Sequence, residues 1–260
     1  LSVLEQDPQE KKDAPAVEFD GVTFTYPTGG APALSDISFA LGHGKTLGII
    51  GGTGSGKSTL ISLIPRFYDV TDGAVKVDGC DVKDYPLQTL RGKIGLVPQK
   101  ALLFLGTIRD NLLWGKENAT DEELYEALRA AQALEVVEGK PKGLDDPVET
   151  GGRNFSGGQR QRLTIARALV RRPELLILDD SASALDFATD AALRRALREL
   201  PWHPAVVIIS QRTASIRFAD EILVLDDGRL AGKGTHDELL ETCEVYREIY
   251  ESQFKKEDAR

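Results

Sequence analysis

The sequence is poor in sulfur-containing residues, and this limits the kinds of protein it can be. It has two cysteines, Cys80 and Cys243, which lie far apart without the spacing of metal ligands. This argues against a disulfide framework and against a cysteine-held metal, and it suits a reducing cytoplasm. The 260 residues include no methionine. The chain therefore does not begin where a reading frame begins, and we expect it to be a piece of a longer protein.

Long apolar runs and an excess of positive charge are also missing. No stretch approaches the roughly 18 apolar residues that a membrane span needs, and residues 1–20 lack the apolar segment of a signal peptide. The net charge is −9 and no long basic run occurs, so we expect no nucleic-acid partner. At 41% hydrophobic residues the chain can bury one large core, or a core with a smaller subdomain, and a soluble globular protein is predicted.

The apolar patterns along the chain predict alternating strands and helices. Residues 1–16 are charged and contain proline without periodicity, as in a linker, so structure is expected from Val17. Alternating residues at 17–26 and 33–41 predict antiparallel strands. Short apolar runs predict strands buried on both faces, and these lie at 46–50, 94–97, 175–178 and 205–209. Helical patterns such as 121–134 and 188–200 separate the runs and indicate an α/β fold with a parallel sheet.

The last part of the chain carries two local signals. Residues 221–234 read as a hairpin that turns at Asp227 and Gly228. Thr235 and Glu238 have the spacing of a capping box, which predicts the start of another helix.

The strongest chemical signal is GGTGSGKST, residues 51–59, which fits the phosphate-loop pattern. Its glycines let backbone N–H groups surround phosphate oxygens at a helix N-terminus. Lys57 can reach the β and γ phosphates of a nucleotide, and Ser58 can ligate magnesium. A buried strand before the loop and a helix after it argue against a chance match.

Two further stretches support a nucleotide site. LLILDD, residues 175–180, delivers Asp179 at the end of a buried strand, where phosphate-loop folds hold magnesium directly or through water. In FSGGQRQRLTIARALVRR, residues 155–172, Ser156 stands where an N-cap would, and Gly157 and Gly158 permit close approach of an anion. An ordinary capped helix explains the serine but not two glycines, each of which costs about 1 kcal/mol in a helix.

In this order, the phosphate loop, Gln99, SGGQ, the acidic strand end, SALD and Gln211 resemble an ABC transporter nucleotide-binding domain, over about residues 17–254. The resemblance implies a phosphate-loop ATPase fold with a mixed core sheet, an antiparallel β subdomain and a helical subdomain at about 100–170. The helical subdomain carries the family's signature, which is the SGGQ stretch at residues 156–159. Residues 255–260 would be a charged tail. PQKALLFLGTIRDNLLWG and TGGRNFSGGQ look most like exporters, multidrug exporters above all, whose ATPase domain follows a membrane domain. Residues 1–16 would be the linker from that membrane domain.

The resemblance also implies cofactors and partners. ATP and Mg²⁺ would bind, and two such domains would pair head to tail, with each ATP between one phosphate loop and the partner's signature. Gly151, Gly152 and Arg153 fall in the loop that meets a coupling helix of the membrane domain. Asp186 matches the end of the D-loop, although a plain helix N-cap explains it almost as well. The expected location is the cytoplasmic face of the cell membrane.

Site roles follow from the resemblance residue by residue. Tyr26 matches the aromatic ring that stacks on adenine, and Gln99 matches the glutamine that contacts magnesium and senses the membrane domain. By themselves they would more often be a strand tyrosine and a surface glutamine. The residues expected to contact ATP are Tyr26, Gly51, Thr53, Gly54, Ser55, Gly56, Lys57, Ser58, Thr59, Ser156, Gly157, Gly158 and Gln159. Those expected at the magnesium ion are Ser58, Gln99 and Asp179.

Two residues depart from the family pattern at one site. Asp180 stands where glutamate normally holds the attacking water as general base, and aspartate is one methylene shorter. Gln211 stands at the switch position, which is usually histidine, and glutamine carries no charge. Misplacement of a base by about 1 Å can cost around 100-fold in rate. The chain is therefore expected to hold a degenerate, slow site with Asp180, Gln211 and Gln99 as its catalytic residues.

The signature, by contrast, departs only in Phe155, where leucine is commoner. The economical interpretation is a heterodimeric exporter in which this chain lends a good signature to the partner's hydrolytic site. A harmless substitution at Gln211 would instead leave the site active, because glutamine positions water in other phosphate-loop enzymes. Two alternative functions also remain. One is a regulatory module that binds ATP and hydrolyses almost none. The other is a soluble ABC protein acting on DNA or ribosomes, which would need an insertion between Gln99 and Ser156 or a second ATPase domain, and the sequence has neither.

Overall fold

The computed structural model describes residues 7–9, 11, 13–181 and 184–257, which divide into two compact units. The first unit extends to Ile94 and resumes at Ala205, and the second runs from Gly95 to Pro204. The helical subdomain expected at about residues 100–170 falls within the second unit. Parts of the predicted linker (1–6, 10 and 12), of the SALD stretch (Ser183) and of the tail (258–260) lie outside the described residues.

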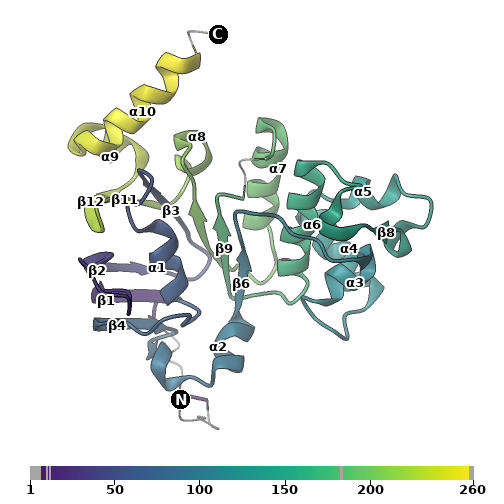
Figure 1. Ribbon diagram of the computed structural model, residues 1–260, viewed down its shortest axis with the longest axis horizontal. Helices are drawn as coiled ribbons and strands as arrows, with labels where there is room; N and C mark the ends of the chain where they lie inside the picture. Colours follow the sequence, from purple (N-terminus) through teal and green to yellow (C-terminus); the bar gives the residue numbers. More distant parts are fainter. Residues whose placement is uncertain (1–6, 10, 12, 182–183, 258–260) are drawn as a thin grey trace. The chain divides into compact units, whose positions relative to one another are not determined.

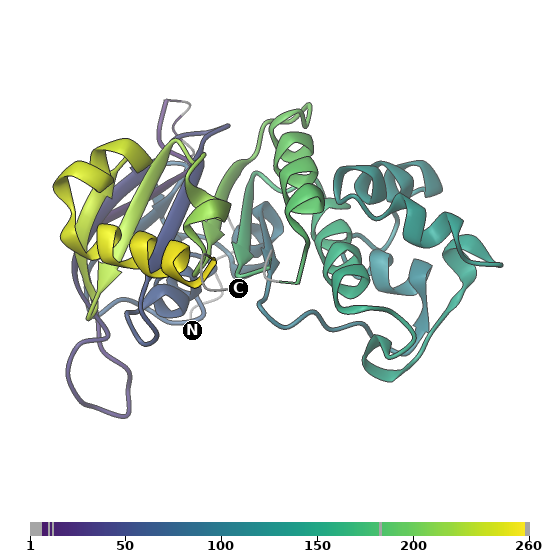
Figure 2. The same cartoon turned by 90° about the horizontal axis from the view of Figure 1, so that it is seen from above.

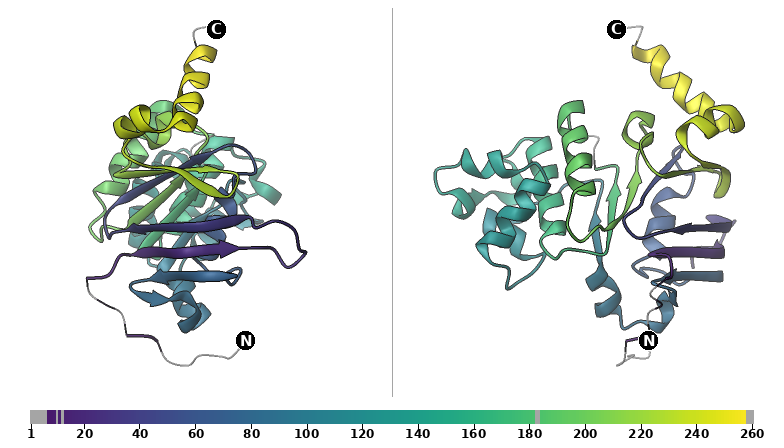
Figure 3. Two further views of the ribbon diagram at one scale, coloured as in Figure 1. Left: turned by 90° about the vertical axis from the view of Figure 1, so that its left-hand side faces the viewer. Right: turned by 180° about the vertical axis from the view of Figure 1, so that it is seen from behind.

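An antiparallel sheet forms one layer of the first unit (Figure 1). Its order is β2-β1-β4-β5, with β1 at Val17–Phe24, β2 at Leu34–Leu41, β4 at Asp72–Val77 and β5 at Cys80–Asp81. Phe19 pairs with Phe39 across β1 and β2, and their rings stack with centroids 4.6 Å apart. The predicted antiparallel pairing is confirmed. The sequence analysis missed β4, which pairs with the other edge of β1, as the left view of Figure 3 shows.

A second, mixed sheet of the first unit has the order β12-β11-β3-β10. Its strands are β3 (Thr46–Gly51), β10 (Ala205–Ile209), β11 (Glu221–Asp226) and β12 (Arg229–Gly234). β3 runs parallel to both β10 and β11, and β12 is antiparallel to β11. Every residue of β10 is buried, as its uninterrupted apolar sequence predicted.

The hairpin between β11 and β12 turns where the sequence predicted. Asp227 and Gly228 have φ of 43° and 75°, the left-handed values that a two-residue hairpin turn requires. Gly228 also lies against the start of β2, because its carbonyl accepts from the Ser35 N–H at 2.8 Å. A Cβ at Gly228 would lie 2.7 Å from the Ala33 oxygen. Both the left-handed backbone and this close approach therefore require glycine at position 228.

The helices of the first unit are α1 (Lys57–Leu63), α2 (Leu87–Lys93), α8 (Thr213–Ile216), α9 (His236–Thr242) and α10 (Glu244–Glu257). A short helical turn at Val82–Asp84 precedes α2. The predicted capping box at α9 is confirmed, since Thr235 and Glu238 exchange hydrogen bonds between side chain and backbone. Figure 2 shows α9 and α10, in yellow, beside the hairpin.

The second unit is mainly helical. Its helices are α3 (Ile108–Leu113), α4 (Asp121–Ala130), α5 (Leu134–Glu138), α6 (Gly157–Leu169) and α7 (Phe187–Arg198), with short turns at Gly143–Asp145 and Thr150–Gly152. β6 (Ile94–Val97) lies beside β9 (Leu175–Asp179), and β7 (Gly106–Thr107) pairs with β8 (Pro147–Val148). The single helix predicted at 121–134 was wrong beyond Ala130. Gln132 has φ of 56°, which ends α4 before α5 begins.

Strands β3 and β11 pack so closely at Gly51 that a larger residue there is expected to destabilise the fold. A Cβ there would lie 2.1 Å from the Leu225 oxygen, whereas a Cβ at Gly52 would meet nothing within 4 Å. We expect Gly51→Ala to lower the free energy of unfolding by about 1–3 kcal/mol, because β3 and β11 must separate. Urea denaturation of both variants provides the measurement. Gly52→Ala is the matched control, and equal midpoints for the two would contradict the prediction.

Candidate functional site

The glycine-rich loop joins β3 to α1 in a conformation that its glycines determine. Gly54 and Gly56 have φ of 82° and 98°, which L-residues rarely adopt. A Cβ at Gly56 would also lie 2.8 Å from Leu34 Cδ2. At Gly54 a Cβ would meet nothing within 4 Å, so only its backbone angle demands glycine. The loop is therefore shaped by packing on one side and open on the other.

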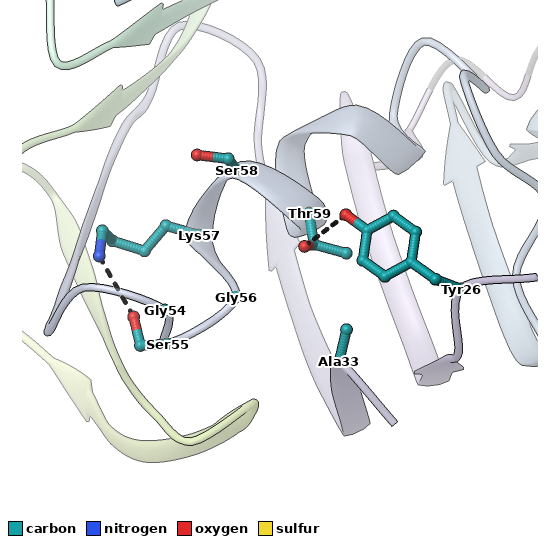
Figure 4. Close-up of a pocket in the computed structure, with 8 residues that line it drawn as sticks. All are labelled: Tyr26, Ala33, Gly54, Ser55, Gly56, Lys57, Ser58 and Thr59. Atoms are coloured by element: carbon teal, nitrogen blue, oxygen red, sulfur yellow. Dashed lines mark hydrogen bonds between the residues drawn. The ribbon is translucent and has the colours of Figure 1, made fainter. Parts of the chain in front are cut away.

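The Lys57 side chain folds back across this loop. Its ammonium donates to the Gly51 and Gly52 carbonyls at 2.8 and 2.6 Å and to Ser55 Oγ at 3.2 Å. Figure 4 shows the bond to Ser55. The positive charge is thus held at the loop, where a phosphate oxygen would be drawn by the ammonium and by the backbone N–H groups at the start of α1.

A pocket of about 260 Å³ lies beside the loop. It is lined by Tyr26, Ala33, Gly54, Ser55, Gly56, Lys57, Ser58 and Thr59 (Figure 4). Seven of these eight residues were predicted to contact ATP. Ala33 was missed, because a small residue before a strand carries no signal of its own. Gly51 and Thr53, also predicted, belong to the loop but do not line this pocket.

Tyr26 has an exposed ring and an anchored hydroxyl. The residue is 36% exposed, and its ring packs edge-on against Phe24 and Tyr68, with centroids 4.8 and 5.4 Å away. Its hydroxyl lies 2.9 Å from Thr59 Oγ1, which is nearly buried. Ser58, the next residue back, is exposed. The two hydroxyls after Lys57 thus differ, with Thr59 holding Tyr26 and Ser58 facing solvent.

In the second unit, β9 delivers two acids at its end. Residues 175–178 are buried, and Asp179 and Asp180 are partly exposed, as the pattern predicted. The Gln99 side chain, which follows β6, donates to Asp180 Oδ2 at 3.3 Å. Asp180 has φ of 44°, a left-handed backbone that aspartate tolerates better than most residues. Two of the three predicted catalytic residues are therefore in contact.

The signature begins α6 as predicted. Ser156 is the N-cap, accepting from the Gln159 N–H at 3.2 Å, while Gln159 Oε1 accepts from the Ser156 N–H at 3.0 Å. The sequence analysis foresaw the cap but not this reciprocal pair. A Cβ at Gly158 would lie 3.2 Å from the Ala184 oxygen, so packing explains one of the two helical glycines. A Cβ at Gly157 has only an ordinary contact.

Phe155, the unusual residue of the signature, is buried at 4% exposure. The Lys140 ammonium lies 4.4 Å from the centre of its ring, a cation–π contact that the sequence did not reveal. Earlier in the sequence, before Phe155, Gly151 and Gly152 have φ of 71° and 68°. The loop before the signature is thus tightly turned, and Arg153 is exposed on it.

Asp186 caps α7, as its simpler interpretation predicted. Its carboxylate accepts from the Thr189 N–H at 2.9 Å and from the Thr189 hydroxyl at 2.8 Å. These hydrogen bonds hold the pKa of Asp186 below its usual value. Gln211, in the first unit, follows β10 and has an exposed side chain. Its backbone carbonyl accepts a hydrogen bond from Gln253 Nε2 at 2.7 Å.

Comparison with known proteins agrees with this geometry. The family model described as ABC transporter matches residues 34–183, more than half of the chain. The uncharacterized ABC transporter ATP-binding protein YfiB of Bacillus subtilis is 47% identical over 93% of this chain and 42% of its own length. The ATP-dependent lipid A-core flippase of Chromobacterium violaceum is 44% identical over 94% of this chain and 42% of its own. A solved structure of a bacterial Atm1-family ABC exporter with ATP bound shares 35% identity, with a TM-score of 0.86, over 96% of this chain and 45% of that one.

The fold and the site thus define a phosphate-loop ATPase-type domain of α/β class, with a mixed sheet and a helical subdomain. The chain belongs to the ABC transporter family. It spans less than half the length of the curated relatives described above. Across the described residues, no helix combines the length and the apolarity needed to cross a membrane.

Proposed function

We propose that the chain is the ATP-binding and ATP-hydrolysing motor domain of an ABC exporter. The observation that carries this proposal is the pocket beside the phosphate loop, which is lined by Lys57, the glycines Gly54 and Gly56, and the exposed Tyr26. The loop suits the phosphates and the ring suits the adenine. An ATP-bound exporter structure of the same fold supports the choice of nucleotide, and a related flippase supports the transport class.

Magnesium fits the donors that the chain offers. Among the described residues, no group of three or more His, Cys, Asp or Glu side chains could hold a metal ion by itself. Mg²⁺ is commonly bound by one or two carboxylates together with nucleotide phosphates, so it would arrive with ATP. We assign the Ser58 hydroxyl, the Asp179 carboxylate and the Gln99 amide as its protein donors. The ion would neutralise charge on the β and γ phosphates.

The site of this chain is proposed to be slow. Asp180 would hold the attacking water, and its shorter side chain already accepts from Gln99. Gln211 would orient water or phosphate by hydrogen bonding but would bring no positive charge. A regulatory module with essentially no hydrolysis is the alternative, and it shares the same ATP pocket. Turnover by the chain decides between the two.

The proposed partners are a second nucleotide-binding domain and the coupling helices of a membrane domain at the cytoplasmic face. The reciprocal cap of Ser156 and Gln159 keeps the signature helix ordered and supports its use on a partner's nucleotide. Because the signature is nearly intact while Asp180 and Gln211 depart from the pattern, an unlike partner is favoured.

Removal of the Lys57 charge tests the pocket. We expect Lys57→Ala to weaken MgATP binding by at least about tenfold, since a hydrogen bond to a charged group contributes about 1.5–3 kcal/mol. Equilibrium titration with a fluorescent ATP analogue measures this. Lys233→Ala, which removes an exposed lysine paired with Glu221, is the matched control. Equal affinity in the two variants would refute the assignment.

A further inference from the structure

The N-terminus of α8 is capped by a residue from the other end of the chain. Arg212 occupies the N-cap position and makes no capping bond with its side chain. Gln253, on α10, supplies the acceptor instead. Its Oε1 accepts from the Thr213 N–H and from the Thr213 hydroxyl, both at 3.0 Å. Helix α8 has only four residues and begins two residues after Gln211. The capping of its N-terminus thus depends on a side chain that lies 40 residues later in the sequence.

The nitrogen of the Gln253 side-chain amide contacts Gln211, the residue at the switch position. Gln253 Nε2 donates to the Gln211 carbonyl at 2.7 Å. A backbone N–H can only donate and a carbonyl can only accept, so these partners fix which end of the amide faces which group. Gln253 therefore bridges residues 211 and 213, and no other uncharged side chain of equal length carries a donor and an acceptor in this arrangement.

Helix α10 is itself anchored on the first unit. Tyr246 is fully buried, and its hydroxyl lies 2.8 Å from His236 Nδ1. Burial raises the pKa of Tyr246 to about 12, so the hydroxyl stays protonated at neutral pH. Tyr250 and Gln253 follow at spacings of four and seven residues, which place them on the same face of the helix. Gln253 therefore lies on a helix whose first turn is held in place by the buried Tyr246.

From these contacts we infer that Gln253 is a positioning residue, which sets the orientation of Gln211 by holding its carbonyl and capping α8. The inference rests on the proposed function, in which Gln211 acts at the γ-phosphate. Gln253 acts through the switch backbone rather than on the nucleotide. A change at Gln253 should therefore alter the rate of hydrolysis without altering the affinity of the phosphate loop for ATP.

Two substitutions separate the two bonds. Gln253→Glu keeps an acceptor for Thr213 but loses the donor to the Gln211 carbonyl, and Gln253→Leu loses both. Glu248→Gln, at an exposed position of the same helix, is the control. Steady-state MgATP turnover and amide hydrogen exchange at Thr213 are measured on the whole chain.

We expect kcat to fall by about 10- to 100-fold in both Gln253 variants with KM unchanged, since small displacements of catalytic groups have effects of this size. Thr213 should exchange about 3- to 10-fold faster in Gln253→Leu and at the wild-type rate in Gln253→Glu. The slow turnover of Gln253→Glu despite a protected Thr213 is the result that a purely stabilising cap would not give.

Wild-type kcat in both variants would overturn the inference, whatever happens to Thr213. If the unaltered chain neither binds nor hydrolyses ATP, the proposed function fails instead. Amide exchange at Thr213 then still tests the hydrogen bond between Gln253 and Thr213. An unchanged exchange rate in Gln253→Leu would show that this bond does not protect Thr213.

Discussion

The variant Ser156→Arg is expected to lose ATP turnover by about 100-fold or more while binding ATP as well as the unaltered chain does. In the proposed head-to-tail pair, arginine would put a bulky cation where the partner's γ-phosphate approaches. It would also remove the hydroxyl that accepts from the Gln159 N–H. Misplacement of reacting groups by about 1 Å costs around 100-fold. The phosphate loop, in the other unit, keeps its own contacts.

Mixing two inactive variants tests whether the signature acts on the partner's nucleotide, with a second copy of this chain in place of the proposed unlike partner. In a pair made of Lys57→Ala and Ser156→Arg chains, one composite site carries both defects and the other carries neither. Turnover should therefore return in the mixture, in proportion to the mixed pairs. A signature that acted within its own chain would leave every site defective.

Ser156→Thr is the control for this experiment, because threonine keeps the capping hydroxyl. It should retain most of the turnover. A mixture as inactive as its two components, at concentrations where the chains pair, would count against the head-to-tail site.

The second large effect is expected from restoring the family residues Glu and His at positions 180 and 211, where we propose that the site is slow. Asp180→Glu combined with Gln211→His should raise turnover by about 100-fold, since a positioned base contributes roughly 100- to 10,000-fold. Glutamate regains the missing methylene and the histidine brings an imidazole to the switch. The left-handed backbone at position 180, with φ of 44°, suits glutamate less well than aspartate, so part of the gain should be lost.

Single-turnover release of γ-phosphate measures this effect in a self-paired complex of the chain, which stands in for the proposed unlike pair. The nearly intact signature of the chain would then face both sites. Asp180→Glu alone should give part of the gain, because in the proposed mechanism both groups would act on the same water and phosphate, and their effects need not add. Asp180→Asn should lower the rate further. An unchanged rate in the double variant would mean that the aspartate is not the limiting defect.

The sequence alone predicted the elements whose signals are local. The buried runs at 94–97 and 205–209 correspond to β6 and β10 residue for residue, because continuous apolar sequence has few other places to lie. The turn at Asp227 and Gly228 and the cap at Thr235 also follow from residue types a few positions apart. Elements without such signals were missed or wrongly bounded. DGAVKV in β4 is a weak pattern, and the end of α4 depends on the conformation of Gln132.

The nucleotide site divides in the same way. GGTGSGKST and SGGQ determine a phosphate loop and a capped helix by themselves, since their glycines, lysine and serine act on backbone within a few residues. Tertiary structure decided that Ala33 lines the pocket, that Gln99 contacts Asp180, and that Gln253 caps α8. These pairs are separated by tens of residues. A hydrogen bond between distant side chains depends on where the sheets and helices place them, and no local pattern encodes that placement.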